Sequence, residues 1–291
     1  MQPSITVFNN VINDILNLDF ELQVLSNNNL FTEGPVWNVD GYYLYSDITA
    51  NCVYKLVPGE EKEVFISNSG CSEKNDLLKE DMVGSNALAY YGDSLLVCQH
   101  GNHGIAKWKG GILEPFIHEY NGNPFNSPND LIVHSDGRIF FSDPPYGLKD
   151  SKLNPDHFQP VAGIYCYKNG EVTLINTQYQ YPNGVCLMPD ETKLFACSNK
   201  PFERFVTVFD TKTMESKVLC EENGDGIETD PAGNIYLCSN DGLVIVNSNG
   251  ERLALIKFET IPSNLCWGGA KKKDLFITSR QNVFLIRDFL K

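Results

Sequence analysis

Six residues with an oxygen atom in the side chain each stand immediately before an apolar, strand-like run of the sequence. They are Glu33, Asn86, Asn129, Asn183, Asp225 and Asn264. Two are carboxylates and four are amides, and oxygen donors of these kinds bind hard divalent cations. Equivalent positions of a repeat point to one place in space. We therefore expect the chemistry of this chain where these six residues meet.

The spacing of the six residues indicates a repeat. Successive members are 53, 43, 54, 42 and 39 residues apart, about 46 on average. Periods of roughly 40–50 residues are typical of propeller folds, in which each repeat forms one small sheet. The 291-residue chain therefore divides into six units. Because the repeat continues without a linker, residues 1–291 are predicted to form a single domain.

Each unit shows the same order of strand and turn signals. A first strand follows the polar residue, a turn such as Asp40-Gly41 or Asp136-Gly137 comes next, and further strands complete the unit. Second strands are expected at Tyr42–Tyr45, Ser94–Cys98, Arg138–Ser142, Lys193–Cys197, Asn234–Cys238 and Asp274–Thr278. The pattern predicts an all-β, six-bladed β-propeller with four-stranded antiparallel blades.

The last unit has no room for a fourth strand before Lys291. We predict that Glu21–Leu25, upstream of the first unit, supplies this strand and closes the ring. A closed ring of sheets leaves only short, protected edges. Residues 1–20 precede this strand and are predicted to form an N-terminal strap or a short helix, within Pro3–Asn17.

Composition narrows the setting in which the protein works. The formal net charge of −14 opposes nucleic-acid phosphates and anionic lipid, so we expect no nucleic-acid and no membrane partner. No apolar stretch is long enough to span a bilayer. The nine cysteines form no Cys-x-x-Cys motif and lie mostly in apolar runs, which indicates free thiols and a reducing, cytoplasmic location. The sequence leaves the oligomeric state open.

Four of the six polar residues form a candidate cation site. The innermost strand of each blade lines the central channel, so a residue at its start faces the channel mouth. Glu33, Asn129, Asn183 and Asp225 would then offer two carboxylates and two amide oxygens to one point. Two carboxylates also balance the charge of a dication, which two amides alone would not do.

The other two polar residues receive a different assignment. Asn86 and Asn264 share the position, but a cation cannot be held by all six side chains. We assign them to the pocket wall or to hydrogen bonds between neighbouring strands. An ordinary turn is the alternative for Asn183-Gly184 and Asp225-Gly226, because both are common turn dipeptides.

A second group of polar residues follows the second strands, where these strands return to the same face of the ring. His100 is one member, and the corresponding positions are Asp47, Asp143, Asn199, Asn240 and Arg280. We interpret them as an outer polar wall, with a structural role as the alternative for each. The chain contains no Gly-x-Ser-x-Gly, His-Glu-x-x-His or Gly-rich phosphate motif.

Two insertions are longer than hairpin loops require. They are Asn68–Val83 and Pro144–Ala162. Loops of this length in a compact domain are commonly lids or binding loops, and surface decoration is the alternative. Candidate substrate contacts within the second insertion are Tyr146, Lys149, His157 and Phe158.

Several motifs together carry a family resemblance. They are Glu33-Gly34-Pro35-Val36-Trp37, Ser127-Pro128-Asn129-Asp130, Ser142-Asp143-Pro144-Pro145-Tyr146-Gly147, Pro182-Asn183-Gly184-Val185 and Asp225-Gly226-Ile227. With these motifs the chain resembles the gluconolactonase, regucalcin (senescence marker protein) and luciferin-regenerating enzyme family. The likeness runs from about Leu30 to Ile286 and is greatest to the bacterial gluconolactonase branch.

The resemblance implies a six-bladed propeller with one catalytic divalent metal. Carried over by motif, the ligands are Glu33, Asn129, Asn183 and Asp225. Calcium is the first expectation, with zinc, magnesium and manganese as alternatives. The implied reaction is hydrolysis of a sugar lactone, a small-molecule partner, to the open aldonate. In regucalcin-like members an Arg two residues before the second ligand helps to hold the sugar, but Ser127 stands there in this chain.

Physical chemistry makes a lactonase plausible independently of the resemblance. A bound dication polarises a carbonyl and stabilises the oxyanion that forms when water attacks. Asp225 is the candidate general base. The alternative is that Asp225 mainly orients the water, because metal coordination favours its ionised form and weakens it as a base. The expected substrate contacts are Asn129, His100, Tyr146 and Arg204.

Two other functions are kept as alternatives. A related, diisopropylfluorophosphatase-like propeller hydrolase would act on phosphotriesters or hydrophobic lactones and would want an apolar pocket, whereas a sugar needs several polar contacts. His100, Asn199 and Arg204 favour the sugar. A non-enzymatic propeller scaffold needs no carboxylates in the channel mouth, and Glu33 with Asp225 argue against it.

Overall fold

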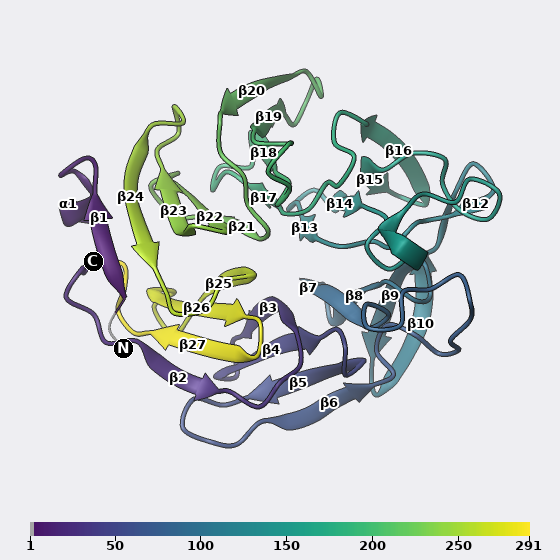
Figure 1. Cartoon of the computed structure of the whole chain (residues 1–291), viewed down its shortest axis with the longest axis horizontal. Helices are drawn as coiled ribbons and strands as arrows, with labels where there is room; N and C mark the ends of the chain where they lie inside the picture. The colour runs from purple at the N-terminus through teal and green to yellow at the C-terminus, as the bar shows by residue number, and fades with distance from the viewer. Residues whose placement is uncertain (1–2) are drawn as a thin grey trace.

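The strands form six antiparallel sheets around a central channel (Figure 1). The computed structural model describes residues 3–291. Each sheet is one blade, and successive strands of a blade lie progressively further from the channel. The all-β, six-bladed propeller that the repeat predicts is therefore confirmed.

The blades contain the strands in a regular order. The innermost strands are β3 (Thr32–Asn38), β7 (Ser85–Tyr91), β13 (Leu131–Val133), β17 (Val185–Leu187), β21 (Ile227–Thr229) and β25 (Asn264–Gly268). The second strands are β4 (Tyr42–Asp47), β8 (Ser94–Gln99), β14 (Ile139–Asp143), β18 (Lys193–Ala196), β22 (Ile235–Ser239) and β26 (Asp274–Ser279). The boundaries of these second strands agree with the predicted ones to within two residues.

The outer strands complete each sheet. The third strands are β5 (Cys52–Leu56), β9 (Gly104–Lys109), β15 (Gly163–Lys168), β19 (Val206–Asp210), β23 (Gly242–Val246) and β27 (Asn282–Ile286). The fourth strands are β6 (Glu63–Ser67), β10 (Ile112–Ile117), β16 (Glu171–Asn176), β20 (Ser216–Cys220), β24 (Arg252–Lys257) and β2 (Gln23–Ser26). A small hairpin, β11 (Glu119–Tyr120) and β12 (Asn123–Pro124), and a 3-10 turn, η1 (Lys149–Ser151), lie outside the blades.

Burial explains why the second strands are the clearest sequence signal. Every residue of β8, β14 and β22 is buried, because neighbouring blades cover both faces of these strands. The fourth strand β20 is mostly exposed. Tight turns join the first two strands of a blade, and Gly92 and Gly137 adopt φ angles of 61° and 88° there. Glycine adopts this left-handed region without steric cost.

The ring closes as predicted. β2, from the N-terminal part of the chain, pairs antiparallel with β27 and becomes the fourth strand of the last blade. The expected segment was Glu21–Leu25, and the observed strand begins two residues later. Pairing of the two ends of the chain covers an edge that would otherwise expose unpaired backbone groups.

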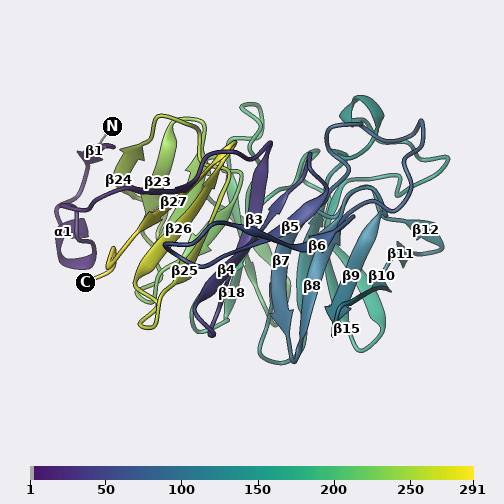
Figure 2. The ribbon, with the colours of Figure 1, turned by 90° about the horizontal axis from the view of Figure 1, so that it is seen from below.

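The residues before β2 contribute an element that the sequence analysis did not predict. β1 (Ser4–Val7) pairs with β24 as a fifth strand of the neighbouring blade. A single helical turn, α1 (Ile12–Ile15), follows it. Phe20 then packs edge-on against Phe289, with ring centroids 5.3 Å apart. The C-terminal residues therefore pack against residues 12–20, and both ends of the described chain lie on the same side of the ring (Figures 1 and 2).

Hydrogen bonds near the start of each inner strand join every blade to the next. The six bonds are Ser46 Oγ to Asn86 O (2.6 Å), Ala87 N to Asn129 O (3.0 Å), Val185 N to Asp130 Oδ2 (2.9 Å), Gly184 N to Asp225 O (2.9 Å), Gly226 N to Ser263 O (2.7 Å) and Ser263 Oγ to Thr32 O (2.7 Å). These bonds hold the six strand starts at one level around the channel.

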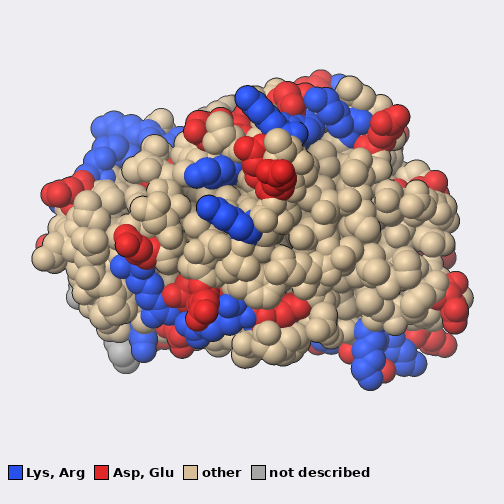
Figure 3. All heavy atoms as spheres, turned by 90° about the horizontal axis from the view of Figure 1, so that it is seen from above, with Lys and Arg blue, Asp and Glu red and all other residues tan. Residues whose placement is uncertain are grey.

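The outer surface mixes charges of both signs. Lys and Arg lie among Asp and Glu on the face shown in Figure 3. Mixed surface charge contributes to solubility rather than to the choice of fold. Within residues 3–291, no helix combines the length and the apolar character that a membrane crossing requires.

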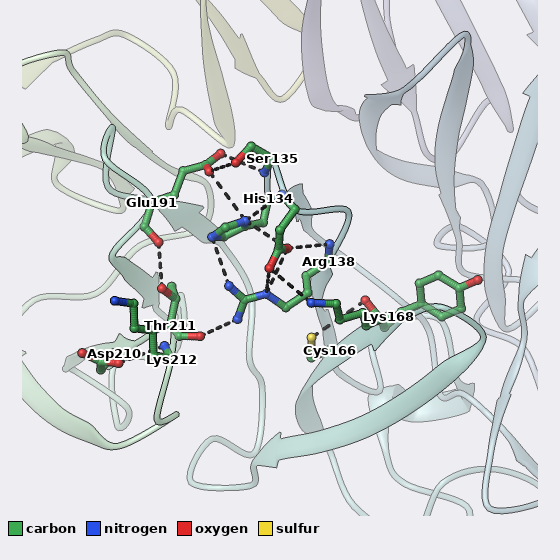
Figure 4. A network of polar contacts seen from close by, with 11 residues as sticks. His134, Ser135, Arg138, Cys166, Lys168, Glu191, Asp210, Thr211 and Lys212 are labelled. Atoms are coloured by element: carbon green, nitrogen blue, oxygen red, sulfur yellow. Dashed lines mark hydrogen bonds and ion pairs between the residues drawn. The ribbon is translucent and has the colours of Figure 1, made fainter.

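A charged cluster ties the third blade to the fourth (Figure 4). Arg138, next to the β13–β14 turn, donates to the Asp136 carboxylate at 2.9 Å and to the backbone carbonyl of Thr211 in the fourth blade. The Glu191 carboxylate accepts the backbone N–H of Ser135 at 3.0 Å. Burial tends to raise the pKa of Asp136, but hydrogen bonds and charge from Arg138 outweigh it and lower that pKa to about 2.

We expect Arg138→Ala to lower the free energy of unfolding by about 1–3 kcal/mol, because the variant loses charge-assisted hydrogen bonds and leaves a carbonyl without its donor. Urea unfolding at pH 7 measures the change. Lys109→Ala is the matched control, since Lys109 and Asp93 form an ion pair with side chains 62% and 74% exposed, and such pairs contribute about 0–1 kcal/mol. Equal losses in the two variants would show that the Arg138 contacts do not contribute to the stability of the fold.

Candidate functional site

The six polar residues named above lie at or just before the starts of the inner strands. Five of them are buried, with exposed fractions of 4% for Glu33, 2% for Asn86, 4% for Asn129, 3% for Asn183 and 7% for Asn264, while Asp225 is partly exposed. Inner strands of neighbouring blades contact one another around the channel. The fold thus brings residues more than 200 positions apart in sequence to one ring.

Two carboxylates of this ring influence each other. Burial raises the pKa of Glu33 well above its ordinary value, and the negative charge of Asp225 raises it further. The Gly34 N–H, which donates to Glu33 Oε2 at 3.1 Å, and the side chain of Asn264 oppose this rise. Two like charges held in a buried ring favour protonation or a compensating cation.

Asp225 also has several positive or donating neighbours. Asn183 Nδ2 donates to Asp225 Oδ1 at 2.5 Å. Burial raises the pKa of Asp225, whereas hydrogen bonds from Asn199 and Asn183 and the charges of Arg280 and Lys200 lower it. This carboxylate is therefore oriented from two sides and faces two cationic side chains.

An aromatic and cationic wall lies beside Asp225. The Tyr146 hydroxyl donates to Asn199 Oδ1 at 2.8 Å. The Nζ atom of Lys200 lies 4.9 Å from the ring centroid of Tyr146 and 4.6 Å from that of Tyr181. No motif marks Lys200 or Tyr181 in the sequence, and the one signal for Lys200 is its position next to Asn199. This wall presents polar groups that suit a hydroxylated ligand.

The second strand of the same blade, β14, accepts hydrogen bonds from Asn129 and from the segment before it. The Asn129 N–H donates to the Ser142 carbonyl at 2.9 Å. The Asp143 carboxylate accepts the backbone N–H groups of Asn126 at 2.9 Å and Ser127 at 2.8 Å. Asp143, expected in an outer polar wall, therefore anchors the chain that leads into Asn129.

The expected outer wall combines two different rows of residues. Asp47 and Asp143 are the last residues of β4 and β14, whereas β8, β22 and β26 end one residue before His100, Asn240 and Arg280. A one-residue offset of this kind changes the face on which a strand residue lies. The rows therefore differ in their contacts, and the row of Asp47 and Asp143 bonds to backbone.

Asn264 and Asn86 make hydrogen bonds within the ring. Asn264 Oδ1 accepts the N–H of Leu265 at 2.8 Å, and the same side chain bonds to Glu33. Asn86 Nδ2 lies 3.4 Å from His100 Nε2. Among the described residues, no group donates to the buried Asn86 Oδ1. The ring therefore contains an acceptor whose hydrogen bond is not satisfied by the protein.

Of the two further expected substrate contacts, His100 is buried and Arg204 is exposed. His100 is fully buried, its Nδ1 lies 3.0 Å from the Met82 carbonyl, and burial lowers its pKa to about 4, so its imidazole is neutral at pH 7. Arg204 has a side chain 48% exposed and donates to Glu222 Oε2 at 3.1 Å. Contact of either residue with a substrate stays a prediction.

The two long insertions pair with each other. Lys79 N donates to the Gly147 carbonyl at 2.9 Å, and Lys149 N donates to the Leu77 carbonyl at 2.8 Å. Within the second insertion, Phe158 is buried and lies against His103, with ring centroids 4.2 Å apart. Tyr146 belongs to this paired segment, so the two loops together position one side of the Asp225 wall.

The donor set of the ring fits a hard divalent cation. In the part of the chain that the structure describes, no group of three or more His, Cys, Asp or Glu side chains could hold a metal. Glu33 and Asp225 instead have amide groups as neighbours, and the buried Asn86 Oδ1 lacks a donor. Carboxylate and amide oxygens together are the donors that calcium and magnesium prefer.

The fold and the ring define a class of protein. It is a six-bladed propeller with paired carboxylates and amides at the channel ends of its inner strands. The family described as SMP-30/Gluconolactonase/LRE-like region matches residues 31–281. The chain belongs to this family, as the sequence motifs indicated.

A sequence relative agrees with this assignment, and two solved structures share the fold. A gluconolactonase from Zymomonas mobilis is 28% identical, and the similarity covers 97% of this chain and 85% of that protein. A solved gluconolactonase from Xanthomonas campestris superposes with a TM-score of 0.85 at 24% identity, covering 100% of this chain and 95% of the other. A calcium-binding regucalcin from Agrobacterium tumefaciens gives a TM-score of 0.73 at 18% identity, covering 94% and 95%.

We expect Glu33→Gln to stabilise the protein in the presence of a chelator. A carboxyl whose pKa is raised by folding makes the fold less stable as pH rises through that range, so removal of the charge at pH 7 removes this penalty. The Tm should rise by roughly 2–4 °C, the shift that about 1 kcal/mol produces in domains of somewhat smaller size. Differential scanning calorimetry measures the change.

Glu222→Gln provides the comparison for this experiment. Its carboxylate pairs with Arg204 and Arg252, so that loss of its charge should lower the Tm under the same conditions. A lower Tm for Glu33→Gln as well would show that the Glu33 charge is already compensated within the fold.

Proposed function

We propose that this lactonase opens a sugar lactone to the aldonic acid with the help of one divalent cation. The observation that carries the proposal is the ring itself, in which the carboxylates of the buried Glu33 and the partly exposed Asp225 lie close enough to raise the pKa of Glu33 and have amide side chains as neighbours. Such a shift is commonly retained where the charges have a ligand. Glu33, Asn129, Asn183 and Asp225 would hold the cation, with calcium as the first expectation.

The names of relatives support the substrate and the metal. The Zymomonas mobilis relative is a gluconolactonase, and the structural neighbour from Agrobacterium tumefaciens is described as calcium-binding. The chain itself belongs to the family described as SMP-30/Gluconolactonase/LRE-like region. We therefore propose glucono-1,5-lactone as the first substrate to test.

The residues of the site supply the remaining chemistry. When bound, a divalent cation would act as a Lewis acid toward the lactone carbonyl. Asp225 bonds to Asn183 and Asn199, and in this proposal it would accept a proton from the attacking water and return it to the ring oxygen as the ester C–O bond breaks. Addition of one water to the cyclic ester gives a single hydroxy acid, and there is no separate leaving group.

The wall around Asp225 favours a hydroxylated substrate over a phosphotriester. Tyr146, Asn199, Lys200 and Arg280 surround this carboxylate with hydrogen-bonding or cationic groups. A buried hydrogen-bonding site discriminates strongly against ligands that leave its groups unpaired. We therefore expect a phosphotriester to be a poorer substrate than a sugar lactone.

We expect lactone opening to require the cation and both carboxylates. Proton release from glucono-1,5-lactone is followed after chelation and after adding back calcium, zinc, manganese or magnesium, with spontaneous hydrolysis subtracted. Asp225→Ala should lower kcat/KM by about 10²-fold or more, the usual contribution of a general base, and Glu33→Ala should weaken cation binding.

Asp93→Ala is the control, because Asp93 is an exposed carboxylate paired with Lys109. Full cation-dependent activity in both Asp225→Ala and Glu33→Ala would show that the proposed site is wrong. Turnover of a phosphotriester in preference to the lactone would instead favour the alternative hydrolase.

A further inference from the structure

We propose that Asp47, Asp143 and Glu203 are positioning residues that hold three of the candidate cation ligands in place. Each is a buried carboxylate that accepts hydrogen bonds from two consecutive backbone N–H groups. In each case these N–H groups lie three and two residues before a ring residue. This inference rests on the proposed function, because it concerns the same cation site.

The contact pattern repeats in three blades. Asp47 accepts the N–H groups of Leu30 (2.8 Å) and Phe31 (2.9 Å), ahead of Glu33. Asp143 accepts those of Asn126 (2.9 Å) and Ser127 (2.8 Å), ahead of Asn129. Glu203 accepts those of Gln180 and of Tyr181 (3.1 Å), ahead of Asn183. Hydrogen bonds from backbone N–H groups to a carboxylate are among the stronger ones in proteins.

In the fourth blade the carboxylate comes from a different sequence position than in the first and third blades. Asn129 N bonds to Ser142 O and Asn183 N bonds to Cys197 O, so Ser142 and Cys197 occupy equivalent positions. The residue after Ser142 is Asp143, and the residue after Cys197 is Ser198. A serine is too short to bridge two N–H groups. Its hydroxyl instead donates to Glu203 Oε2 at 2.7 Å, and Glu203 provides the carboxylate.

Two residue types, Asp at the end of a second strand and Glu in a later segment, therefore make the same backbone contacts. Asp47 and Asp143 end their second strands, whereas Glu203 lies in the segment before β19. A requirement for burial alone would not place all three carboxylates on the same pair of N–H groups. In all three blades a candidate cation ligand follows these N–H groups by two or three residues. We therefore infer that the three carboxylates fix the backbone from which the ligand side chains project. Partners of metal ligands commonly contribute 10–100-fold to metal affinity.

The test moves the anchor of the fourth blade to the position used in the first and third blades. Glu203→Ala removes the carboxylate, and Ser198→Asp/Glu203→Ala returns one at the position equivalent to Asp143. Calcium affinity is measured by titration calorimetry well below the Tm of every variant. We expect about 10–100-fold weaker binding for Glu203→Ala and recovery of most of this loss in the double variant.

Glu191→Ala is the matched control within the same blade. Glu191 also accepts a backbone N–H, that of Ser135, but no ring residue follows Ser135 within two or three positions. The control should lower the Tm without changing the calcium affinity. Calcium affinity that stays unchanged in Glu203→Ala, or a double variant that recovers its Tm but not its affinity, would overturn the positioning role.

Failure of the proposed function has a different signature. A wild-type protein that binds none of the four cations would contradict the cation site itself. Hydrogen exchange of the backbone from Gln180 to Asn183 then decides the anchoring separately. We expect exchange to become faster in Glu203→Ala and to slow again in Ser198→Asp/Glu203→Ala, and unchanged exchange in Glu203→Ala would overturn the anchor.

Discussion

The hydrogen bonds between neighbouring inner strands are the constraint on which the site depends. Each strand start is bonded to the next blade, as in Ala87 N to Asn129 O and Gly226 N to Ser263 O. Because the chain of bonds runs around the whole channel, no single strand can shift along the channel without breaking bonds on two sides. Six side chains are thereby held at one level, and the pairing of β2 with β27 completes the sheets that carry them.

An unfavourable electrostatic interaction between two carboxylates lies in this ring of inner-strand starts. Glu33 and Asp225 are ionisable groups in a buried ring, and burial together with like charge raises the pKa of Glu33. A fold selected for stability alone would place neutral side chains there. The surrounding structure supports the pair with donors, including Asn264 for Glu33 and Asn183 for Asp225. Stability and the proposed cation site are therefore in opposition at one location, as is common in functional sites.

Sequence periodicity predicted much of the fold because buried second strands have an unmistakable composition. Prediction was weaker where contacts connect distant segments. The pairing of β1 with β24 does not follow from the repeat, because that blade already has its four strands and the repeat calls for no fifth strand. Sequence position alone puts Asp47 and His100 in one row, but β4 ends at Asp47 whereas β8 ends one residue before His100. Glu203 escaped notice because it reaches its position from a loop and breaks the repeat.

The sequence by itself determined the number of blades, the closing strand and the six polar residues at equivalent positions, because each follows from local patterns that recur about every 46 residues. It also carried the family motifs. Only the tertiary structure decided which polar residues act on one another: Asp225 with Asn199 and Lys200, Glu33 with Asn264, and Glu203 with the backbone before Asn183. These contacts join different blades or distant loops, and the distances between such groups are set by the closure of the ring rather than by any local pattern.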